Sequence, residues 1–166
     1  MNLDNWCFYF NRNGFKEDEK KIESIIFNLP KPIVFTNGVF DILHPGHVRY
    51  LNESKKLGAS LIVGINSNQS ARMLQKGSNR PIINHKDRAE IILSLKPVDL
   101  CIIFSQKTPE FLIKKIKPDI YTKGDDYNSN TINYFNLLKE LKIKTAFIPL
   151  LKNKSSTQII NKIKNI

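Results

Sequence analysis

The segment VFTNGVFDILHPGH, residues 34–47, is the part of the chain that decides the fold. Its start continues a short apolar run from Ile33, bounded by prolines, which predicts a buried strand at 33–36. Gly38 lets the backbone approach a ligand closely, because glycine has no Cβ. Pro45 suits the first turn of a helix, where its missing N–H costs nothing. The segment therefore predicts a strand, a glycine turn and a helix in direct succession.

Two histidines stand at the start of the expected helix. His44 and His47 are three residues apart, so within the first turn they share one face. The unpaired N–H groups and the positive dipole end of a helix favour an anion at that place. Nucleotidyl transfer depends mainly on positioning and on charge neutralisation. These features predict a site where a phosphate chain is bound and its α-phosphorus is attacked.

Two simpler interpretations of the histidine pair are weaker. A zinc half-site would need further ligands, but the remaining candidates are His85 and two cysteines inside apolar runs, Cys7 and Cys101. No C-x-x-C or H-E-x-x-H pattern is present, so we expect no protein metal site. Simple helix capping by the histidines would not account for the preceding strand, for Gly38 or for Asp41.

Length and composition limit the functional class. The 166 residues fit one domain, and a hydrophobic content of 41% argues against disorder. We find neither an apolar run of about eighteen residues nor a leader pattern, so we expect a cytoplasmic protein without a membrane partner. Lys and Arg outnumber Asp and Glu by 26 to 15. The basic residues are scattered and form no stacking platform with aromatics, so steering of small polyanions is favoured over nucleic-acid binding.

The chain divides into two expected parts. Residues 1–30 contain an aromatic cluster at 6–10 and a helical pattern at 17–29, and we interpret them as a helical extension that packs on the domain or on a subunit neighbour. Residues 31–166 alternate between strands and helices, which predicts a doubly wound, Rossmann-like parallel sheet of five strands with helices on both faces. The expected strands are 33–36, 60–65, 98–104, 119–122 and 145–149; the expected helices include 45–57 ending at Gly58, 86–95, 108–117, 130–141 and one from 155 or 156.

The segment T-N-G-V-F-D-I-L-H-P-G-H resembles the H-x-G-H signature of the cytidylyltransferase-like nucleotidyltransferases. In that superfamily the two histidines stabilise the charge on the α-phosphate of a nucleoside triphosphate as a nucleophile displaces pyrophosphate. Further ordered segments resemble the heptose 1-phosphate adenylyltransferase family, which makes ADP-heptose. These segments are L-I-V-G-I-N-S-N (61–68), N-R-P-I-I-N (79–84) with D-R-A (87–89), T-P-E (108–110), I-K-P-D (116–119), K-G-D-D-Y (123–127) and S-S-T (155–157).

The resemblance implies transfer of AMP from ATP, with Mg²⁺, to a heptose 1-phosphate for surface polysaccharide synthesis. It also implies a separate sugar kinase that supplies the sugar phosphate. Two departures leave the choice between ATP and CTP open. Asp125 stands where a glycine is usual, as in glycerol-3-phosphate cytidylyltransferase, and Lys154 replaces an apolar residue or cysteine. The alternatives are therefore that cytidylyltransferase, an FMN adenylyltransferase, or a non-catalytic nucleotide- or nucleic-acid-binding module. We also expect a homo-oligomer, with the N-terminal segment as a contact.

The resemblance assigns expected roles along the chain. Phosphate stabilisation falls to His44, His47, Lys76 and Arg88. Lys76 would swing over the triphosphate, unless it is simply solvated, and Arg88 would bind phosphate at a helix start, unless it forms an exposed ion pair with Asp87 or Glu90. The expected nucleotide-binding residues are Thr36, Asn37, Gly38, Val39, Phe40, Lys123, Gly124, Asp125, Asp126, Ser155, Ser156 and Thr157.

The roles of residues 123–126, residues 155–157 and Asp41 are each open to more than one interpretation. Residues 123–126 would bind the ribose and base or form an ordinary acidic turn, and residues 155–157 would hold phosphate or only cap a helix. Asp41 is expected to contact substrate, and three roles are open for it: orienting a histidine, holding Mg²⁺ through water, or binding sugar hydroxyls.

Overall fold

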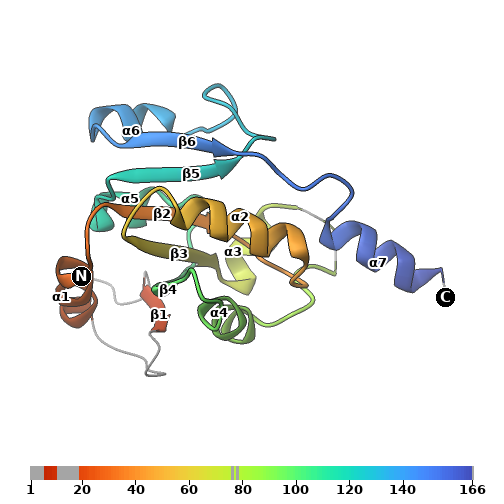
Figure 1. The fold of residues 1–166 in the computed structure, drawn as a ribbon. Coiled ribbons are helices and arrows are strands. Elements are labelled where there is room, and N and C mark those ends of the chain that lie inside the picture. Colours follow the sequence, from red (N-terminus) through yellow and green to blue (C-terminus); the bar gives the residue numbers. More distant parts are fainter. Residues whose placement is uncertain (1–5, 11–18, 76, 78, 166) are drawn as a thin grey trace.

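The computed structural model describes residues 6–10, 19–75, 77 and 79–165, and in this part of the chain six strands form one sheet (Figure 1). Five of them run parallel, and one edge strand is antiparallel. The strands lie in the order β1 (Trp6–Phe10), β4 (Leu100–Phe104), β3 (Ser60–Asn66), β2 (Ile33–Gly38), β5 (Ile120–Gly124) and β6 (Lys144–Ile148).

The helices between successive parallel strands are α2 (Pro45–Lys55), α3 (Asn68–Met73), α4 (His85–Leu93), α5 (Glu110–Ile116) and α6 (Phe135–Glu140). Of the other described helices, α1 (Glu19–Asn28) lies between β1 and β2, and α7 (Ser156–Lys164) follows β6. The expected parallel sheet of five strands is confirmed. None of the described helices has both the length and the apolar composition needed to cross a membrane.

The expectation of a purely helical N-terminal extension is wrong in one respect. Trp6–Phe10 forms β1, which pairs antiparallel with β4, and the helix found among the described residues of this segment is Glu19–Asn28. The aromatic composition of this run favours a strand, and β4 would otherwise present an open edge. The N-terminal segment thus extends the same sheet.

The strand order places a switch point at the centre of the sheet. From β2 the chain proceeds through β3 and β4 on one side, and then returns to build β5 and β6 on the other. Ligands of open parallel sheets bind at such a point, beyond the carboxyl ends of the strands. Here those ends are Gly38 of β2 and Gly124 of β5. In Figure 1, α7 lies beyond the same ends.

Two apolar layers cover the sheet, as the alternation of strand side chains requires. Val34 packs in one cluster with Leu51 of α2 and Ile92 of α4. Phe35, the next residue, belongs to the opposite cluster with Ile113 of α5 and Leu138 of α6. Both faces of β2 are buried from Ile33 to Thr36, and its carboxyl end, Asn37 and Gly38, is half-buried.

Gly58, after α2, has a different role from the helix-ending one that the sequence predicts. Its φ is not positive, and the residue that caps α2 is Lys56. A Cβ on Gly58 would lie 2.4 Å from the carbonyl oxygen of Pro32 and 2.7 Å from Cγ2 of Val34. Glycine is needed because the chain passes directly over the start of β2.

We expect Gly58→Ala to lower the free energy of unfolding by about 1–3 kcal/mol, the usual cost of overpacking. Urea denaturation followed by circular dichroism measures the change. Lys56→Ala, at an exposed position of the same turn, should change it by less than about 0.5 kcal/mol. Equal stabilities of the glycine and alanine proteins would contradict the close contact.

Candidate functional site

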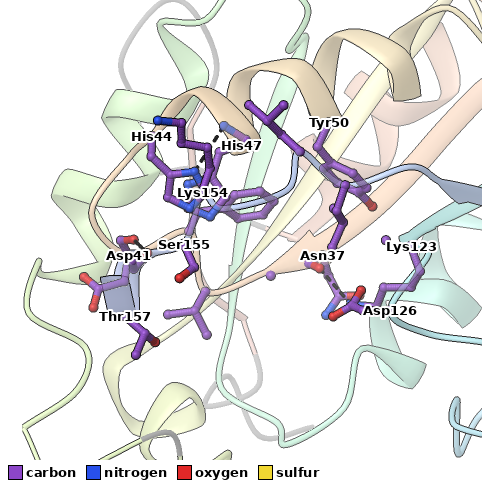
Figure 2. Close-up of a pocket in the computed structure, with 18 of the residues that line it drawn as sticks. Asn37, Asp41, His44, His47, Tyr50, Lys123, Asp126, Lys154, Ser155 and Thr157 are labelled. Carbon is purple, nitrogen blue, oxygen red and sulfur yellow. Dashed lines mark hydrogen bonds between the residues drawn. The ribbon is translucent and has the colours of Figure 1, made fainter. Parts of the chain in front are cut away.

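A cavity of about 560 Å³ lies at the switch point, between the carboxyl ends of β2 and β5 and the first turns of α2 and α7 (Figure 2). It gathers residues from five stretches of the chain, at 37–50, 71, 80–81, 123–127 and 150–157. The expected site residues that line it are Asn37, Gly38, Val39, Phe40, Asp41, His44, His47, Lys123, Gly124, Asp126, Ser155, Ser156 and Thr157.

Four expected residues are not placed in the cavity wall. Lys76 lies outside the described residues. Thr36 is fully buried, and its hydroxyl is 2.6 Å from the Tyr50 hydroxyl. Asp125 is exposed, and its Oδ1 accepts a hydrogen bond from the backbone N–H of Leu150. Arg88 is buried and is described below.

The turn between β2 and α2 has an unusual backbone. Phe40 and Ile42 adopt φ values of 51° and 49°, in the left-handed region that residues other than Gly and Asn seldom occupy. Asp41 lies between them. Such backbone conformations persist only where the surrounding contacts hold them, and they cluster at functional sites.

His44 is the N-cap residue of α2, and its ring has a defined proton position. Nδ1 accepts a hydrogen bond of 3.1 Å from the backbone N–H of Gly46. The proton of the neutral ring therefore lies on Nε2, because Nδ1 must offer its lone pair. His44 thus caps the helix and retains an Nε2–H donor.

The rings of His44 and His47 stack, with centroids 3.8 Å apart and planes at 25°. The ring of Phe40 packs against His47, with ring centroids 5.3 Å apart. Burial lowers the pKa of His47 from 6.5 to about 4; the neighbouring His44 lowers it further, and Asp41 opposes the shift. Burial also lowers the pKa of His44. Both rings are therefore neutral at pH 7 in the free protein and act as N–H donors.

The titration of His47 is a direct test of this arrangement. In the ligand-free protein we expect its ring to titrate near pH 4, because protonation requires charging a buried imidazole beside His44. Proton NMR of the ring Cε1–H signals measures the midpoint, with assignments from His44→Gln and His85→Gln. Pyrophosphate should raise the midpoint, since an anion stabilises the imidazolium. A midpoint near 6.5 without ligand would show that His47 is solvated.

The structure shows contacts of Asp41 that the sequence did not predict. Its side chain is nearly completely buried, and its two carboxylate oxygens each accept a backbone N–H at 2.9 Å, from Ile82 and Ile83. Arg80 Nε lies 3.3 Å from Oδ2. The hydroxyl of Ser156 donates to the carbonyl oxygen of Asp41. Asp41 therefore joins three segments of the site, and both of its carboxylate oxygens are engaged by the protein.

The predicted phosphate contact of Arg88 is not available in the structure. The side chain is 1% exposed and lies outside the cavity wall. Its guanidinium donates to the carbonyl oxygens of Val39, Ile83 and Asn66 and to Oδ1 of Asn68. Burial lowers its pKa to about 10, so it stays charged at pH 7. The predicted alternative, an exposed ion pair, is also wrong, because Arg88 instead fastens the turn after β2 to α4.

Arg80 supplies the guanidinium that does line the cavity. Besides its ion pair with Asp41, its Nη1 lies 3.4 Å from the hydroxyl of Thr157 in α7. The sequence shows Arg80 only as the residue before Pro81 in a family-like segment. Tyr50 and Tyr127 are further wall residues that the sequence prediction missed; Tyr127 directly follows the K-G-D-D segment, which was the available signal.

The start of α7 contributes hydroxyls with different duties. Ser155 caps the helix, accepting the N–H of Gln158 at 3.2 Å, while the Ser156 hydroxyl is used within the protein. Thr157 is exposed beside Arg80. Lys154 also lines the cavity. This end of the cavity therefore combines a helix N-terminus with two cationic side chains, which suits a phosphate chain.

The other end of the cavity is formed by β5. Lys123 Nζ donates to the carbonyl oxygen of Asn37 at 2.9 Å and lies 5.1 Å from the ring centre of Tyr127. A Cβ on Gly124 would lie 2.5 Å from Oδ1 of Asp126 and 2.9 Å from Cδ1 of Leu150, so a side chain there would displace the ends of these two exposed side chains. Figure 2 shows Asn37, Lys123 and Asp126 on one side of the histidines, and Asp41 and Thr157 on the other.

The comparisons with known proteins agree with this geometry. The cytidylyltransferase-like family model matches residues 35–162. The chain belongs to that family. It is 43% identical, over 82% of the chain and 84% of the relative, to a D-beta-D-heptose 1-phosphate adenylyltransferase of Bordetella bronchiseptica. It is 47% identical to the bifunctional protein HldE of Campylobacter fetus over 92% of this chain, but spans only 33% of that protein.

A solved structure supports the same assignment. The lipopolysaccharide core biosynthesis protein of Thermoplasma volcanium superposes with a TM-score of 0.61 at 34% identity. The match covers 74% of this chain and 98% of that protein. The family assignment thus rests on sequence and fold together.

Proposed function

We propose that this chain transfers AMP from ATP to D-glycero-D-manno-heptose 1-phosphate, forming ADP-heptose and pyrophosphate. The observation that carries the proposal is the stacked pair of neutral histidines at the start of α2, inside a cavity that has a cationic helix end on one side. The names of the relatives supply the nucleotide and the sugar. In this proposal a phosphate oxygen of the sugar attacks the α-phosphorus of ATP, the bond to the β-phosphate breaks, and pyrophosphate leaves. The nucleophile is already ionised, so no general base is needed.

His44 and His47 donate to the α-phosphate in this proposal. The Nε2–H of His44 is free for that contact because Nδ1 is held by Gly46. Donors that are neutral before the reaction and face developing negative charge stabilise a transition state more than the ground state. The backbone of residues 37–40 and the first turn of α2 would hold further phosphate oxygens.

The two cavity ends receive different parts of ATP. Arg80, Lys154 and the start of α7 bind the leaving pyrophosphate, and the family resemblance adds Lys76 to them. Lys123, Gly124 and Asp126 contact the nucleoside. Asp125, one ground for considering CTP, lies outside the cavity wall, so its replacement of glycine does not change the side chains that face the nucleotide. Asp125 therefore gives no reason to prefer CTP over ATP as the nucleotide.

Mg²⁺ fits the site as an ion carried by the triphosphate. Within the described residues no group of three or more His, Cys, Asp or Glu side chains is arranged to hold a metal. Mg²⁺ usually keeps several waters and takes one or two carboxylates besides substrate phosphates. Asp126 is an exposed carboxylate in the cavity wall that suits such a contact. When bound, the ion would neutralise charge on the phosphates.

A substrate panel tests the proposal. Pyrophosphate release is measured with ATP and heptose 1-phosphate, CTP and glycerol 3-phosphate, and ATP and FMN. We expect turnover with the first pair, at a kcat/KM at least about a hundredfold above the other pairs. Turnover with another pair would reassign the substrates. No turnover, together with strongly salt-dependent binding of RNA or DNA, would favour a non-catalytic module.

Two further expectations concern the partners of this chain. A sugar kinase must supply the heptose 1-phosphate. This chain matches only a third of the length of the bifunctional relative. A homo-oligomer with contacts through the N-terminal segment remains a prediction. Sedimentation equilibrium of the full chain tests it, and a monomer across the concentration range would contradict it.

A further inference from the structure

A buried chain of hydrogen bonds ends at the wall of the cavity. The hydroxyl of Tyr134 lies 2.7 Å from that of Tyr121, and the Tyr121 hydroxyl donates to Oδ1 of Asn37 at 2.6 Å. Tyr121 is fully buried in β5, Tyr134 is buried at the start of α6, and Asn37 is half-buried in the cavity wall. The histidine chemistry described above uses neither tyrosine.

The direction of the protons in this chain follows from valence. A tyrosine hydroxyl has one proton, and that of Tyr121 is given to Asn37. Tyr121 must therefore accept from Tyr134, whose hydroxyl is the donor of the other contact. Aligned hydrogen bonds polarise one another, so each bond strengthens the next. The result is a relay that points from Tyr134 to the carboxamide oxygen of Asn37.

The backbone of Asn37 is held as firmly as its side chain. Its carbonyl oxygen accepts from Lys123 Nζ at 2.9 Å, and the residue is paired with Gly64 between β2 and β3. With Oδ1 taken by Tyr121, the Nδ2 amino group is the part of the side chain that makes no hydrogen bond to another described residue. On the same side of the cavity lie the donor Lys123 and the carboxylate Asp126, and the two histidines lie to one side of them (Figure 2).

We propose that Tyr121 and Tyr134 are positioning residues that orient the Asn37 carboxamide so that its amino group donates to a phosphate oxygen of the bound substrate. This inference rests on the proposed function, because it needs a phosphate in the cavity. The phosphate belongs either to ATP or to the sugar 1-phosphate. Without the relay the carboxamide can turn over and present its oxygen to the phosphate, which would repel it.

Burial keeps the relay in one state. It raises the pKa of Tyr121 well above 10, with Tyr134 adding to the shift, and it raises the pKa of Tyr134. Both hydroxyls therefore keep their protons throughout the pH range in which the protein works. Titration of the two tyrosines therefore does not change the orientation of Asn37 near neutral pH.

The binding test uses the side-chain amide of Asn37. In the ¹⁵N-labelled full chain its NH₂ signals are those lost in Asn37→Asp. A non-hydrolysable ATP analogue and heptose 1-phosphate are added in separate arms. We expect the Asn37 signals to shift in one arm, which also identifies the phosphate. If neither ligand moves them while other cavity signals shift, the inference is wrong.

The kinetic test separates positioning from a structural role. We expect Tyr121→Phe to lower kcat/KM about tenfold, the factor for one hydrogen bond of about 1.4 kcal/mol. Tyr134→Phe should lower it about two- to threefold, because Tyr121 still donates to Asn37. Ser54→Ala is the matched control: it removes a buried contact of 3.0 Å to Thr122 and leaves Asn37 untouched, so kcat/KM should stay within twofold. Loss of thermal stability in both tyrosine variants without a kinetic change would overturn the inference.

A second variant covers a failure of Tyr121→Phe to fold. Asn37→Asp keeps the acceptor for Tyr121 but replaces the donor with an anionic oxygen, so kcat/KM should fall about a hundredfold in a folded protein. An Asn37→Asp protein with kinetics within twofold of wild type would contradict the inference. If the wild-type chain fails to use heptose 1-phosphate, the proposed function fails, whereas the ATP-analogue arm still tests Asn37.

Discussion

His47→Ala is expected to lower kcat for pyrophosphate release by about 10²–10³-fold, with a much smaller change in the KM for ATP. The ring lies in the cavity wall, stacked on His44 and packed on Phe40. In the free protein it is neutral, since its pKa is about 4. The donor that it contributes gains strength as negative charge builds on the phosphate, so its loss falls mainly on the transition state.

The measurement is a steady-state assay with ATP varied at saturating sugar phosphate. His85→Gln is the matched control, because His85 lies at the start of α4 and outside the cavity wall. Its kinetic constants should stay within about twofold of wild type. A rise in the KM for ATP with kcat unchanged would assign His47 to ground-state binding and remove it from the chemical step.

Arg88→Met is expected to lower the free energy of unfolding by about 3–5 kcal/mol, the usual result of breaking a buried charged network. The thermal midpoint should then fall by about 6–20 °C, at 2–4 °C per kcal/mol for a chain of this size. The guanidinium is 1% exposed and donates to three backbone carbonyls and to Asn68. Methionine fills similar space but leaves these acceptors unpaired in the interior.

Arg80→Met is the comparison that separates an arginine that stabilises the fold from one that binds the substrate. Arg80 has 18% of its side chain exposed and faces the cavity. Its loss should therefore raise the KM for ATP more than it lowers the thermal midpoint. Differential scanning fluorimetry and the pyrophosphate assay give both quantities for both variants. If Arg88→Met melts like wild type and only binds ATP more weakly, Arg88 contacts phosphate in the working enzyme after all.

Much of the fold was predictable because local pattern and global fold agree in the parallel sheet. The predicted strand at 33–36 lies within β2, and all five predicted parallel strands are present. The edge strand β1 was not predicted as a strand. Its partner β4 is about ninety residues away in the sequence. The five residues of β1 are also too few to show the alternation of apolar and polar residues that identifies a strand. The helix predicted from residue 130 begins only at Phe135.

The candidate site divides in the same way. The glycine turn, the two histidines and the K-G-D-D segment were predicted from consecutive residues, and the structure brings most of them to one cavity. The contacts of Asp41, Arg88 and Arg80 were not predicted from their neighbours. Asp41 binds the backbone of Ile82 and Ile83, forty residues away, and no local pattern reports such a contact.

The sequence alone determined the alternation of strands and helices and the start of α2 with its two histidines, since these depend on residues close along the chain. Tertiary structure decided which arginine is buried and which faces the cavity, because burial depends on how the segments on either side of α4 pack. It also decided the direction of the Asn37 carboxamide, through tyrosines 84 and 97 residues away. The H-x-G-H turn carries the proposed chemistry, while the contacts that hold it come from distant parts of the chain, namely Ile82, Ile83, Arg88 and Ser156.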